Sequence, residues 1–332
     1  MNGEMFEAAV TDDELIAAVG ASVLRLHRTP WEYSTSAPLE LITVERRHGT
    51  SQEYVLKHLA PGHLSERARR VRPSLVVEPR REIETYRRVL GPAGIGPRLI
   101  DSRCIPETGT YWLLIERVRG APLYEAGDIQ TWAAAARWLG EFHSRFASVD
   151  LEPLRRAARL ITYDYAWYRV WLDRARRFFS SEGPARSRRS RAALQWLADR
   201  YDRVIYRLVS LPATLIHGEL YPSNMVVGDG DRRRIYPLDW EMTGIGPGAI
   251  DLAALTSGSW RESERQTLAA AYLESPGASR HLTLPELMDA VAHARIHLAV
   301  QWLGWFGRRA APAAHARDWL GDAIDEAEAL DL

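Results

Sequence analysis

The chain is almost without lysine and almost without cysteine. Its 43 basic residues are 42 arginines and a single lysine, Lys57, in a sequence of 332 residues. Arginine is a wide planar fork and lysine a compact point charge, so a lysine retained among so many arginines points to a role that arginine cannot fill. The one cysteine, Cys104, excludes an internal disulfide, which fits a reducing cytoplasm.

Long apolar runs and a net charge are also missing. No run of 18 apolar residues occurs, so no membrane span is expected. The 43 basic residues are balanced by 43 acidic ones, and no excess charge draws the chain to nucleic acid or to a membrane surface. The first ten residues lack a basic region followed by an apolar stretch, so no signal peptide is expected. These absences predict a cytoplasmic protein.

Several common site signatures are absent as well. The sequence has no GxxxxGK[ST] phosphate loop, because its lysine lies elsewhere, and its glycine triples do not form a dinucleotide-binding fingerprint. It has no HExxH and no CxxC pattern, so a zinc site is not expected. Hydrophobic residues make up 46% and charged residues 26%, which is ordinary for a globular protein with a sizeable core.

The pattern of elements predicts an α+β fold in which a strand-rich part precedes a larger helical part. Strands are predicted in the first part at residues 39–45, 53–59, 98–104 and 110–117. Helices are predicted at 12–27 and 80–90, and the Arg- and Pro-rich residues 61–80 are expected to form a loop. From 129–146 onward the spacing is mostly helical, so the character of the chain changes near residue 118.

The strongest chemical pattern lies between residues 215 and 241. An apolar strand runs into His217 and a glycine, then the carboxylate of Glu219, and five residues later the amide of Asn224. A turn and a second short strand lead to Asp239. Phosphoryl transfer needs such a set: one carboxylate takes the proton of the acceptor hydroxyl, while an amide oxygen and a second carboxylate hold Mg²⁺ against the phosphates.

These motifs resemble those of the aminoglycoside phosphotransferase and choline kinase-like family. HGELYPSN and DWEMTGIGPGAIDLAAL are similar to the family patterns HGDxxxxN and DWExxxxGDPxxDLA. Upstream, WEYSTSAPLE, VLKHL and REIETYRRVL look like its nucleotide loop, its lysine strand and the helix that carries the glutamate partner. The resemblance extends over roughly residues 20 to 310.

The resemblance implies a two-lobed protein-kinase-like fold. Residues 1–117 would form an N-lobe with a small antiparallel sheet that binds the nucleotide. Residues 118–332 would form a mostly helical C-lobe that carries the catalytic and substrate-binding residues. ATP would bind in the cleft between the lobes, together with Mg²⁺.

Roles in nucleotide binding follow from the same resemblance. Lys57 would neutralise the α and β phosphates of ATP, and Glu82 would pair with it; Glu84, on another face of the same helix, is the alternative partner. Two further stretches would contact the nucleotide through the backbone. The phosphate loop would use Ser34, Thr35 and Ser36. The adenine-binding linker would use Glu116, Arg117 and Val118.

The resemblance also assigns the catalytic loop. Asn224 and Asp239 would bind Mg²⁺ and, with Lys57 and Glu219, form the catalytic set. Asp251 would brace this loop from beneath, and so would His217.

Two positions depart from the family. Residues 246–248 read Gly-Pro-Gly where Gly-Asp-Pro is usual, which is a loop change. Glu219 stands where aspartate is usual, and its extra methylene adds about 1.5 Å of reach. Three interpretations remain open: the loop has shifted to compensate, the acceptor sits further away, or the chain is a degraded enzyme. The last of these would be a pseudokinase that binds a nucleotide or a partner without turnover.

The acceptor implied by the resemblance is a hydroxyl of a small molecule or natural product of the antibiotic type. Residues 174–191 are basic, and the clearly acidic segment is the tail at 321–332, which argues against a highly cationic aminoglycoside. A Ser or Thr side chain of a peptide precursor is a second possibility, with a partner enzyme completing a dehydration. The aromatic segment 163–171 is either helix core or one wall of the acceptor site.

Overall fold

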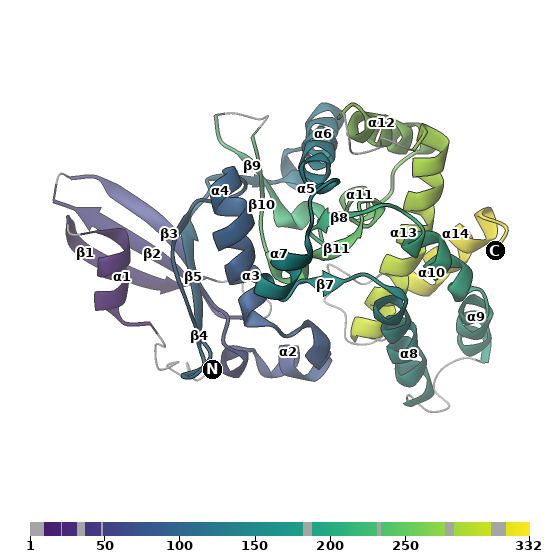
Figure 1. The fold of residues 1–332 in the computed structure, drawn as a ribbon, viewed down its shortest axis with the longest axis horizontal. Coiled ribbons are helices and arrows are strands. Elements are labelled where there is room, and N and C mark those ends of the chain that lie inside the picture. Colours follow the sequence, from purple (N-terminus) through teal and green to yellow (C-terminus); the bar gives the residue numbers. More distant parts are fainter. Residues whose placement is uncertain are drawn as a thin grey trace. The chain divides into compact units, whose positions relative to one another are not determined.

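The computed structural model describes residues 10–20, 22–31, 37–47, 49–181, 188–230, 234–275, 282–306 and 317–332. The chain divides into two compact units, Met1–Arg119 and Gly120–Leu332. The first contains a five-stranded antiparallel sheet and the second is mostly helical, so the predicted α+β, kinase-like fold class is confirmed (Figure 1).

The sheet of the N-terminal unit has the strand order β1-β2-β3-β5-β4, and every neighbouring pair is antiparallel. Its strands are β1 (Val23–Pro30), β2 (Leu39–Arg46), β3 (Ser51–His58), β4 (Leu99–Ile105) and β5 (Thr110–Glu116). Side chains alternate between the two faces along each strand. On β3 the buried Tyr54 and Leu56 therefore face one way, and Val55 and Lys57 face the other.

The helix predicted at 12–27 was wrong in its second half. The first helix, α1 (Asp12–Val19), starts with a capping box between Thr11 and Glu14 and ends at Gly20, whose φ of +99° suits a residue without a Cβ. Residues 23–30 form β1 instead, paired with β2. The apolar spacing fitted both helix and strand, and pairing with the neighbouring strand decided between them.

The loop expected at 61–80 was also wrong in part, because it contains short helices. They are η1 (Pro61–His63), α2 (Glu66–Val71) and η2 (Ser74–Val76). The Ser65 hydroxyl caps α2 by accepting a hydrogen bond from the Ala68 amide. The helix predicted at 80–90 is present as α3 (Pro79–Thr85), a π-helical turn (Tyr86–Leu90) and α4 (Gly91–Ala93).

Opposite faces of the sheet carry α1 and α3. On the α1 face, Leu15 packs in a buried cluster with side chains of β2, β3 and β5, among them Ile42, Leu56 and Trp112. The helix α3 contacts β4 and β5 (Figure 1). Its Glu82 pairs with Lys57, which lies on the face of β3 opposite to Leu56. The alternation of β3 therefore directs Lys57 to the α3 side of the sheet.

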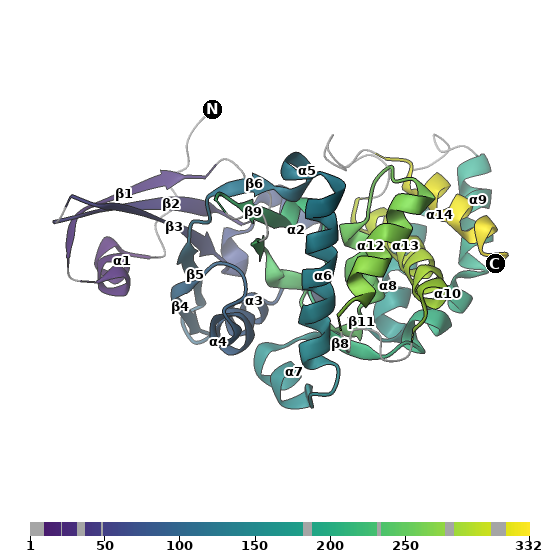
Figure 2. The same ribbon diagram turned by 90° about the horizontal axis from the view of Figure 1, so that it is seen from above.

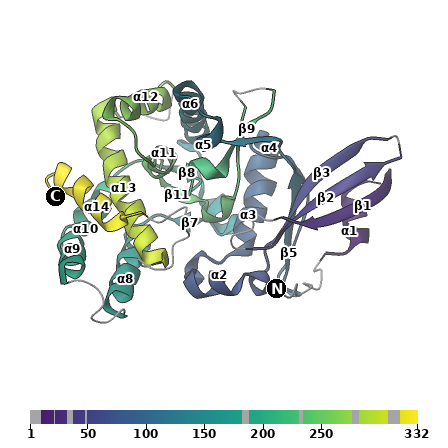
Figure 3. The same ribbon diagram turned by 180° about the vertical axis from the view of Figure 1, so that it is seen from behind.

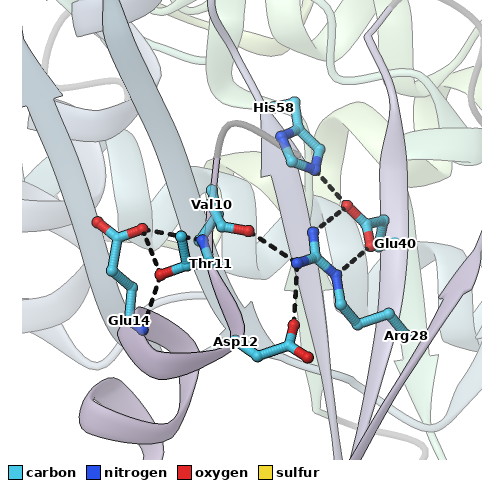
Figure 4. A network of polar contacts seen from close by, with 7 residues as sticks. All are labelled: Val10, Thr11, Asp12, Glu14, Arg28, Glu40 and His58. Atoms are coloured by element: carbon cyan, nitrogen blue, oxygen red, sulfur yellow. Dashed lines mark hydrogen bonds and ion pairs between the residues drawn. The ribbon is translucent and has the colours of Figure 1, made fainter. Parts of the chain in front are cut away.

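A polar network ties α1 to the sheet on its own face (Figure 4). The Arg28 guanidinium donates to both oxygens of Glu40 at 2.7 Å, and also to the Val10 carbonyl and the Asp12 carboxylate. The Nε2 atom of His58 lies 2.5 Å from Glu40 Oε1. Burial alone would raise the pKa of Glu40, but hydrogen bonds with His58 and Arg28 outweigh it and hold the pKa at about 2.

The C-terminal unit consists mainly of helices arranged around α13 (Figures 2 and 3). Its helices are α5 (Leu123–Ala126), α6 (Ile129–Phe146), α7 (Glu152–Ala158), α8 (Tyr165–Ser181), α9 (Arg188–Ala198), α10 (Tyr201–Val209), α11 (Ala249–Leu255), α12 (Glu262–Leu273), α13 (Leu284–Phe306) and α14 (Trp319–Ala329). The long, apolar α13 contacts α8, α10, α11, α12 and α14. No helix within the described ranges is long and apolar enough to cross a membrane.

Two small sheets complete this unit and carry its polar loops. Their orders are β10-β9-β6 and β7-β11-β8. The strands are β6 (Gly120–Pro122), β7 (Ile161–Thr162), β8 (Ala213–Ile216), β9 (Met225–Gly228), β10 (Ile235–Pro237) and β11 (Gly244–Pro247). The strands β8 and β10 correspond to the apolar strand predicted before His217 and to the second short strand predicted before Asp239, and β10 forms a hairpin with β9.

We predict that Glu40→Gln destabilises the protein by about 1–2 kcal/mol at neutral pH, after allowance for partial exposure, because it removes a charged acceptor shared by Arg28 and His58. The pKa of Glu40 is held below its ordinary value of 4.5, so its contribution is complete above that pH and is lost as the pH falls toward 2. Urea unfolding at several pH values measures both effects.

Glu45→Gln is the matched control, since Glu45 lies on the same strand and outside this network. It should leave the unfolding free energy within about 0.5 kcal/mol of the parent. A difference between the parent and Glu40→Gln that stays constant from pH 7 to pH 3 would contradict the prediction.

Candidate active site

Lys57 and Glu82 form the predicted ion pair in the N-terminal unit. The Lys57 Nζ atom lies 2.7 Å from each carboxylate oxygen of Glu82, and the Glu82 side chain is 2% exposed. Glu84, the alternative partner, instead binds Arg87 and Arg88 on its own helix. The preference for Glu82 is therefore confirmed. A buried charge pair adds little to stability by itself, so its retention points to a specific use of the lysine.

The helix that carries Glu82 is fixed by its start and by its apolar face. Pro79 occupies its first turn, and the Glu78 side chain accepts from the Arg80 amide. Ile83 and Tyr86 are fully buried. These contacts hold α3 at one rotation, which directs Glu82 toward β3.

The predicted adenine linker lies at the end of β5. The Glu116 amide donates to the Arg98 carbonyl, and Arg117 is bound through its side chain to the Glu53 carboxylate at 2.7 Å. Val118 follows and is half-buried. The other predicted nucleotide contacts, Ser34, Thr35 and Ser36, lie outside the described residues.

Asp251 holds the turn that precedes Glu219. This carboxylate on α11 is completely buried and accepts hydrogen bonds from the amides of His217 and Gly218, both at 2.7 Å. His143 of α6 lies 3.1 Å from the same carboxylate and also contacts Tyr272 of α12. The bracing role predicted for Asp251 is confirmed by these contacts.

Gly218 cannot be replaced at this turn without moving its neighbours. Its φ is +88°, a conformation that favours glycine. A Cβ at this position would lie 2.2 Å from the Tyr163 hydroxyl and 2.4 Å from the Met242 carbonyl. The backbone conformation and the close neighbours of the turn therefore require the glycine of the His-Gly pair.

His217 links the turn to the second strand of the hairpin. Its Nε2 atom lies 2.8 Å from the Leu238 carbonyl, and its Nδ1 atom accepts from the Glu219 amide at 3.3 Å. Donation from Nε2 and acceptance at Nδ1 define the neutral Nε2–H tautomer. The prediction that His217 braces the loop is thus confirmed.

Asn224 and Asp239 lie at adjoining ends of the β9–β10 hairpin. The hairpin pairs Met225 with Pro237, and the Leu238 amide donates to the Asn224 carbonyl at 2.8 Å. The Asn224 side chain donates its amide N–H to the Glu219 carbonyl at 2.9 Å, which leaves its Oδ1 atom for a cation. Asp239 adopts a left-handed backbone with φ +62°, an uncommon conformation that clusters at functional sites.

The Glu219 side chain has a contact that sequence reasoning missed. Gln301, buried on α13, donates its Nε2 hydrogen to Glu219 Oε1 at 3.2 Å. Beside it, Trp302 donates to the Tyr221 hydroxyl at 2.7 Å. Burial raises the pKa of Tyr221, and the nearby Glu219 charge raises it further. The signal was a single amide in the apolar run LAVQWLGW, where a buried polar side chain needs a partner.

The aromatic segment 163–171 belongs to the helical core. Tyr163, Trp167, Tyr168 and Trp171 are all buried, and the Tyr163 hydroxyl donates to the Met242 carbonyl at 3.0 Å. Of the two interpretations of this segment, the core one agrees with its burial. Tyr163 also packs beside Gly218, at the turn before Glu219.

Comparison with known families places these features in one class. Residues 40–291 match the model described as the phosphotransferase enzyme family, which is more than half of the chain. The chain therefore belongs to the phosphotransferase enzyme family and is a phosphotransferase, as its motifs predicted. No curated protein sequence matches it.

Solved structures with a similar fold include an aminoglycoside phosphotransferase, an ethanolamine kinase and a choline kinase. An aminoglycoside 2′-phosphotransferase with bound GDP has a TM-score of 0.59 at 15% identity, over 94% of this chain and 94% of that one. An ethanolamine kinase of Plasmodium vivax has a TM-score of 0.57 at 15% identity, over 92% and 82%. A choline kinase of Streptococcus pneumoniae has a TM-score of 0.56 at 12% identity, over 93% and 94%. These likenesses support the fold.

We predict that Asp251→Asn destabilises the protein by about 3 kcal/mol, because an amide nitrogen would face a hydrogen-bond donor inside a buried network. Denaturant unfolding measures the loss. Asp199→Asn is the control, since Asp199 is exposed at the end of α9 and should tolerate the change. Equal stability of the two variants would show that the Asp251 contacts do not hold the turn.

Proposed function

We propose that the chain transfers the γ-phosphoryl group of ATP to a hydroxyl of a small molecule or natural product of the antibiotic type, using Mg²⁺. The arrangement that carries the proposal is the set Glu219, Asn224 and Asp239, joined by the Asn224–Glu219 hydrogen bond and the β9–β10 hairpin. A proton acceptor and two oxygen ligands in one rigid loop are what phosphoryl transfer requires.

In this proposal the N-terminal unit binds the phosphates of ATP. Lys57 neutralises the α and β phosphates, while Glu82 keeps its ammonium in place at 2.7 Å. The predicted phosphate loop at Ser34 to Ser36 and the linker from Glu116 to Val118 would supply backbone contacts to the nucleotide. The charge pair fits this use, because a compact ammonium can approach a phosphate without the planar geometry of a guanidinium.

The donor set of the hairpin fits Mg²⁺. The amide oxygen of Asn224 and the carboxylate of Asp239 are hard oxygen ligands, and Mg²⁺ in kinases is typically held by one or two protein oxygens, phosphates and waters. When bound there, the ion neutralises charge on the phosphates. The left-handed backbone of Asp239 supports this assignment, since strain of this kind is retained where a side chain must point at a ligand.

Glu219 would act as the base in the reaction. Its carboxylate accepts the proton of the acceptor hydroxyl while the hydroxyl oxygen bonds to the γ-phosphorus and the bond to the β-phosphate oxygen breaks, releasing ADP. Gln301 donates to one carboxylate oxygen and so limits the rotation of the longer side chain. This contact supports the interpretation that the site has adapted to glutamate.

The comparisons support a small hydroxylated acceptor. Proteins with the same fold are named as kinases of ethanolamine and choline and as phosphotransferases of aminoglycosides. All of these are small molecules that carry hydroxyl groups, and an antibiotic-type acceptor of this chain is consistent with that range.

We predict that ATP with Mg²⁺ raises the melting temperature by about 5 °C at saturating concentration, because a ligand bound by the native state alone stabilises it. Lys57→Ala should weaken this shift by removing the phosphate contact. Asp239→Ala should weaken its dependence on Mg²⁺. Thermal denaturation of the full chain at millimolar ATP, with and without Mg²⁺, measures all three.

Arg25→Ala serves as the control, because Arg25 is an exposed cation on β1 of the same unit. It should retain the full nucleotide effect. The absence of any shift in the parent chain at millimolar ATP would rule out the kinase proposal and leave the fold alone.

We predict that Glu219→Gln keeps ATP binding but lowers turnover about 100-fold or more, because it preserves size and polarity and removes the base. Glu219→Asp should also lower turnover, since aspartate would fall short in a loop fitted to glutamate. Release of ADP in the presence of a panel of hydroxylated compounds measures turnover, and nucleotide binding is measured separately.

The two variants distinguish the remaining interpretations. Higher activity in Glu219→Asp would identify a decayed site in which glutamate is a defect. An unchanged rate in Glu219→Gln on the best acceptor would show that this carboxylate is not the base. Gln301→Leu alone should turn over more slowly than the parent, because it removes the contact that fixes Glu219. Adding Gln301→Leu to Glu219→Asp should restore no activity.

A further inference from the structure

A cavity of about 360 Å³ lies inside the C-terminal unit, next to the catalytic loop. Residues of α11, α12, α13 and α14 line it, and α13 contacts the other three helices (Figure 3). Its size is that of a small-molecule site. The residues that matter for its chemistry are Tyr221, Arg265, Arg295, Arg317, Asp322 and Glu326.

Two arginines of the cavity lining carry buried hydrogen-bond donors that have no partner among the described residues. Arg295 uses Nη1 to bind Glu326 at 2.8 Å, but its Nε and Nη2 atoms are buried and unpaired. Arg265 donates from Nη2 to the Gly258 carbonyl, and its Nε atom is buried and unpaired. Leaving charged donors without acceptors in the interior is costly, so a ligand that accepts these bonds would be bound favourably.

The carboxylates that line the cavity are either paired with an arginine or exposed. Burial lowers the pKa of Arg295, the Glu326 carboxylate raises it in part, and the charge of Arg265 lowers it again. Arg317 is already paired with Asp322. Glu262 and Asp325 also line the cavity, but both are exposed at its rim. The lining as a whole carries three arginines and four carboxylates, so the case for an anionic ligand rests on the unpaired donors of Arg265 and Arg295 and not on an excess of positive charge.

Tyr221 connects this cavity to the proposed base. It lines the cavity, and its amide donates to the Glu219 carbonyl at 2.7 Å. Its hydroxyl accepts a hydrogen bond from Trp302, and the adjacent Gln301 donates to the Glu219 carboxylate. A molecule held by Arg265 and Arg295 would thus extend from the cavity toward the catalytic loop.

We propose that Arg265 and Arg295 bind an anionic group of the acceptor, a carboxylate or a phosphate, while the hydroxyl of the same molecule is presented to Glu219. This assignment rests on the proposed function and specifies its substrate class as a hydroxylated anion or zwitterion. Guanidinium groups suit both anions because their N–H donors match paired oxygens. The acceptor would then carry a negative charge, in contrast to a polycationic aminoglycoside.

Binding without nucleotide tests the cavity independently of phosphoryl transfer. Glycerate and glycerol 3-phosphate are the charged probes, and glycerol is the neutral match. Titration calorimetry on the full chain should detect at least one charged probe and no binding of glycerol. Arg265→Gln should weaken binding of the charged probe about tenfold, as expected for the loss of a charge-assisted hydrogen bond.

Arg295→Lys is a second variant, because it keeps the charge but removes the unpaired planar donors, and it should weaken binding similarly. Arg207→Gln is the control, since Arg207 pairs with Asp289 and does not line the cavity. The proposal is overturned if neither charged probe binds up to about 10 mM, if glycerol binds equally well, or if both cavity variants bind like the parent.

A turnover assay tests the link to the acceptor. Among hydroxylated compounds matched in size, those with a carboxylate or phosphate should have the lowest KM, and Arg265→Gln should raise that KM about tenfold with little change in kcat. Best turnover on a neutral or polycationic compound, with KM unchanged in Arg265→Gln, would refute the proposal. If the calorimetric result holds while no compound is phosphorylated, the cavity assignment survives and the phosphotransferase proposal fails.

Discussion

The loop that carries Glu219 depends on one buried carboxylate. Asp251 accepts hydrogen bonds from two consecutive amides at the turn before Glu219, and His143 contacts the same group from a different helix. Since Gly218 is held at a positive φ, the chain leaves the turn in a single direction. This anchor therefore sets the positions of Glu219, Asn224 and the hairpin. Contacts in the interior of the helical unit thus fix the position of this loop.

Sequence reasoning reached this site because the motif encodes local geometry. His-Gly, the carboxylate, the amide and Asp239 lie within 23 residues of each other, from 217 to 239, and hairpin pairing brings the ends together. The Lys57–Glu82 pair was predicted for a similar reason, since one strand and one helix suffice to define it. Gln301 and the arginines of the cavity come from distant helices, and no local pattern marks them.

Prediction of the fold succeeded where the sequence pattern favoured one type of element, and it failed where the pattern fitted two. The helix at 129–146 was found with its observed limits, because an aspartate cap and a clear apolar face agree. Residues 23–30 have spacing that fits either element, and their pairing with β2 is visible only in three dimensions. The short helices between residues 61 and 76 were hidden by prolines, which start such turns as readily as they end longer ones.

The solitary lysine gives the molecule a built-in chemical label. Lys57 carries the only side-chain amine of the chain, so an amine-directed acylating reagent has a single side-chain target. Its partner Glu82 contacts that amine with both carboxylate oxygens at 2.7 Å and so shields it from the reagent while the pair is intact. The rate of acylation at Lys57 consequently reports how often the pair opens. Because the other basic residues are arginines, opening of the contact between β3 and α3 can be measured in solution without any engineered residue.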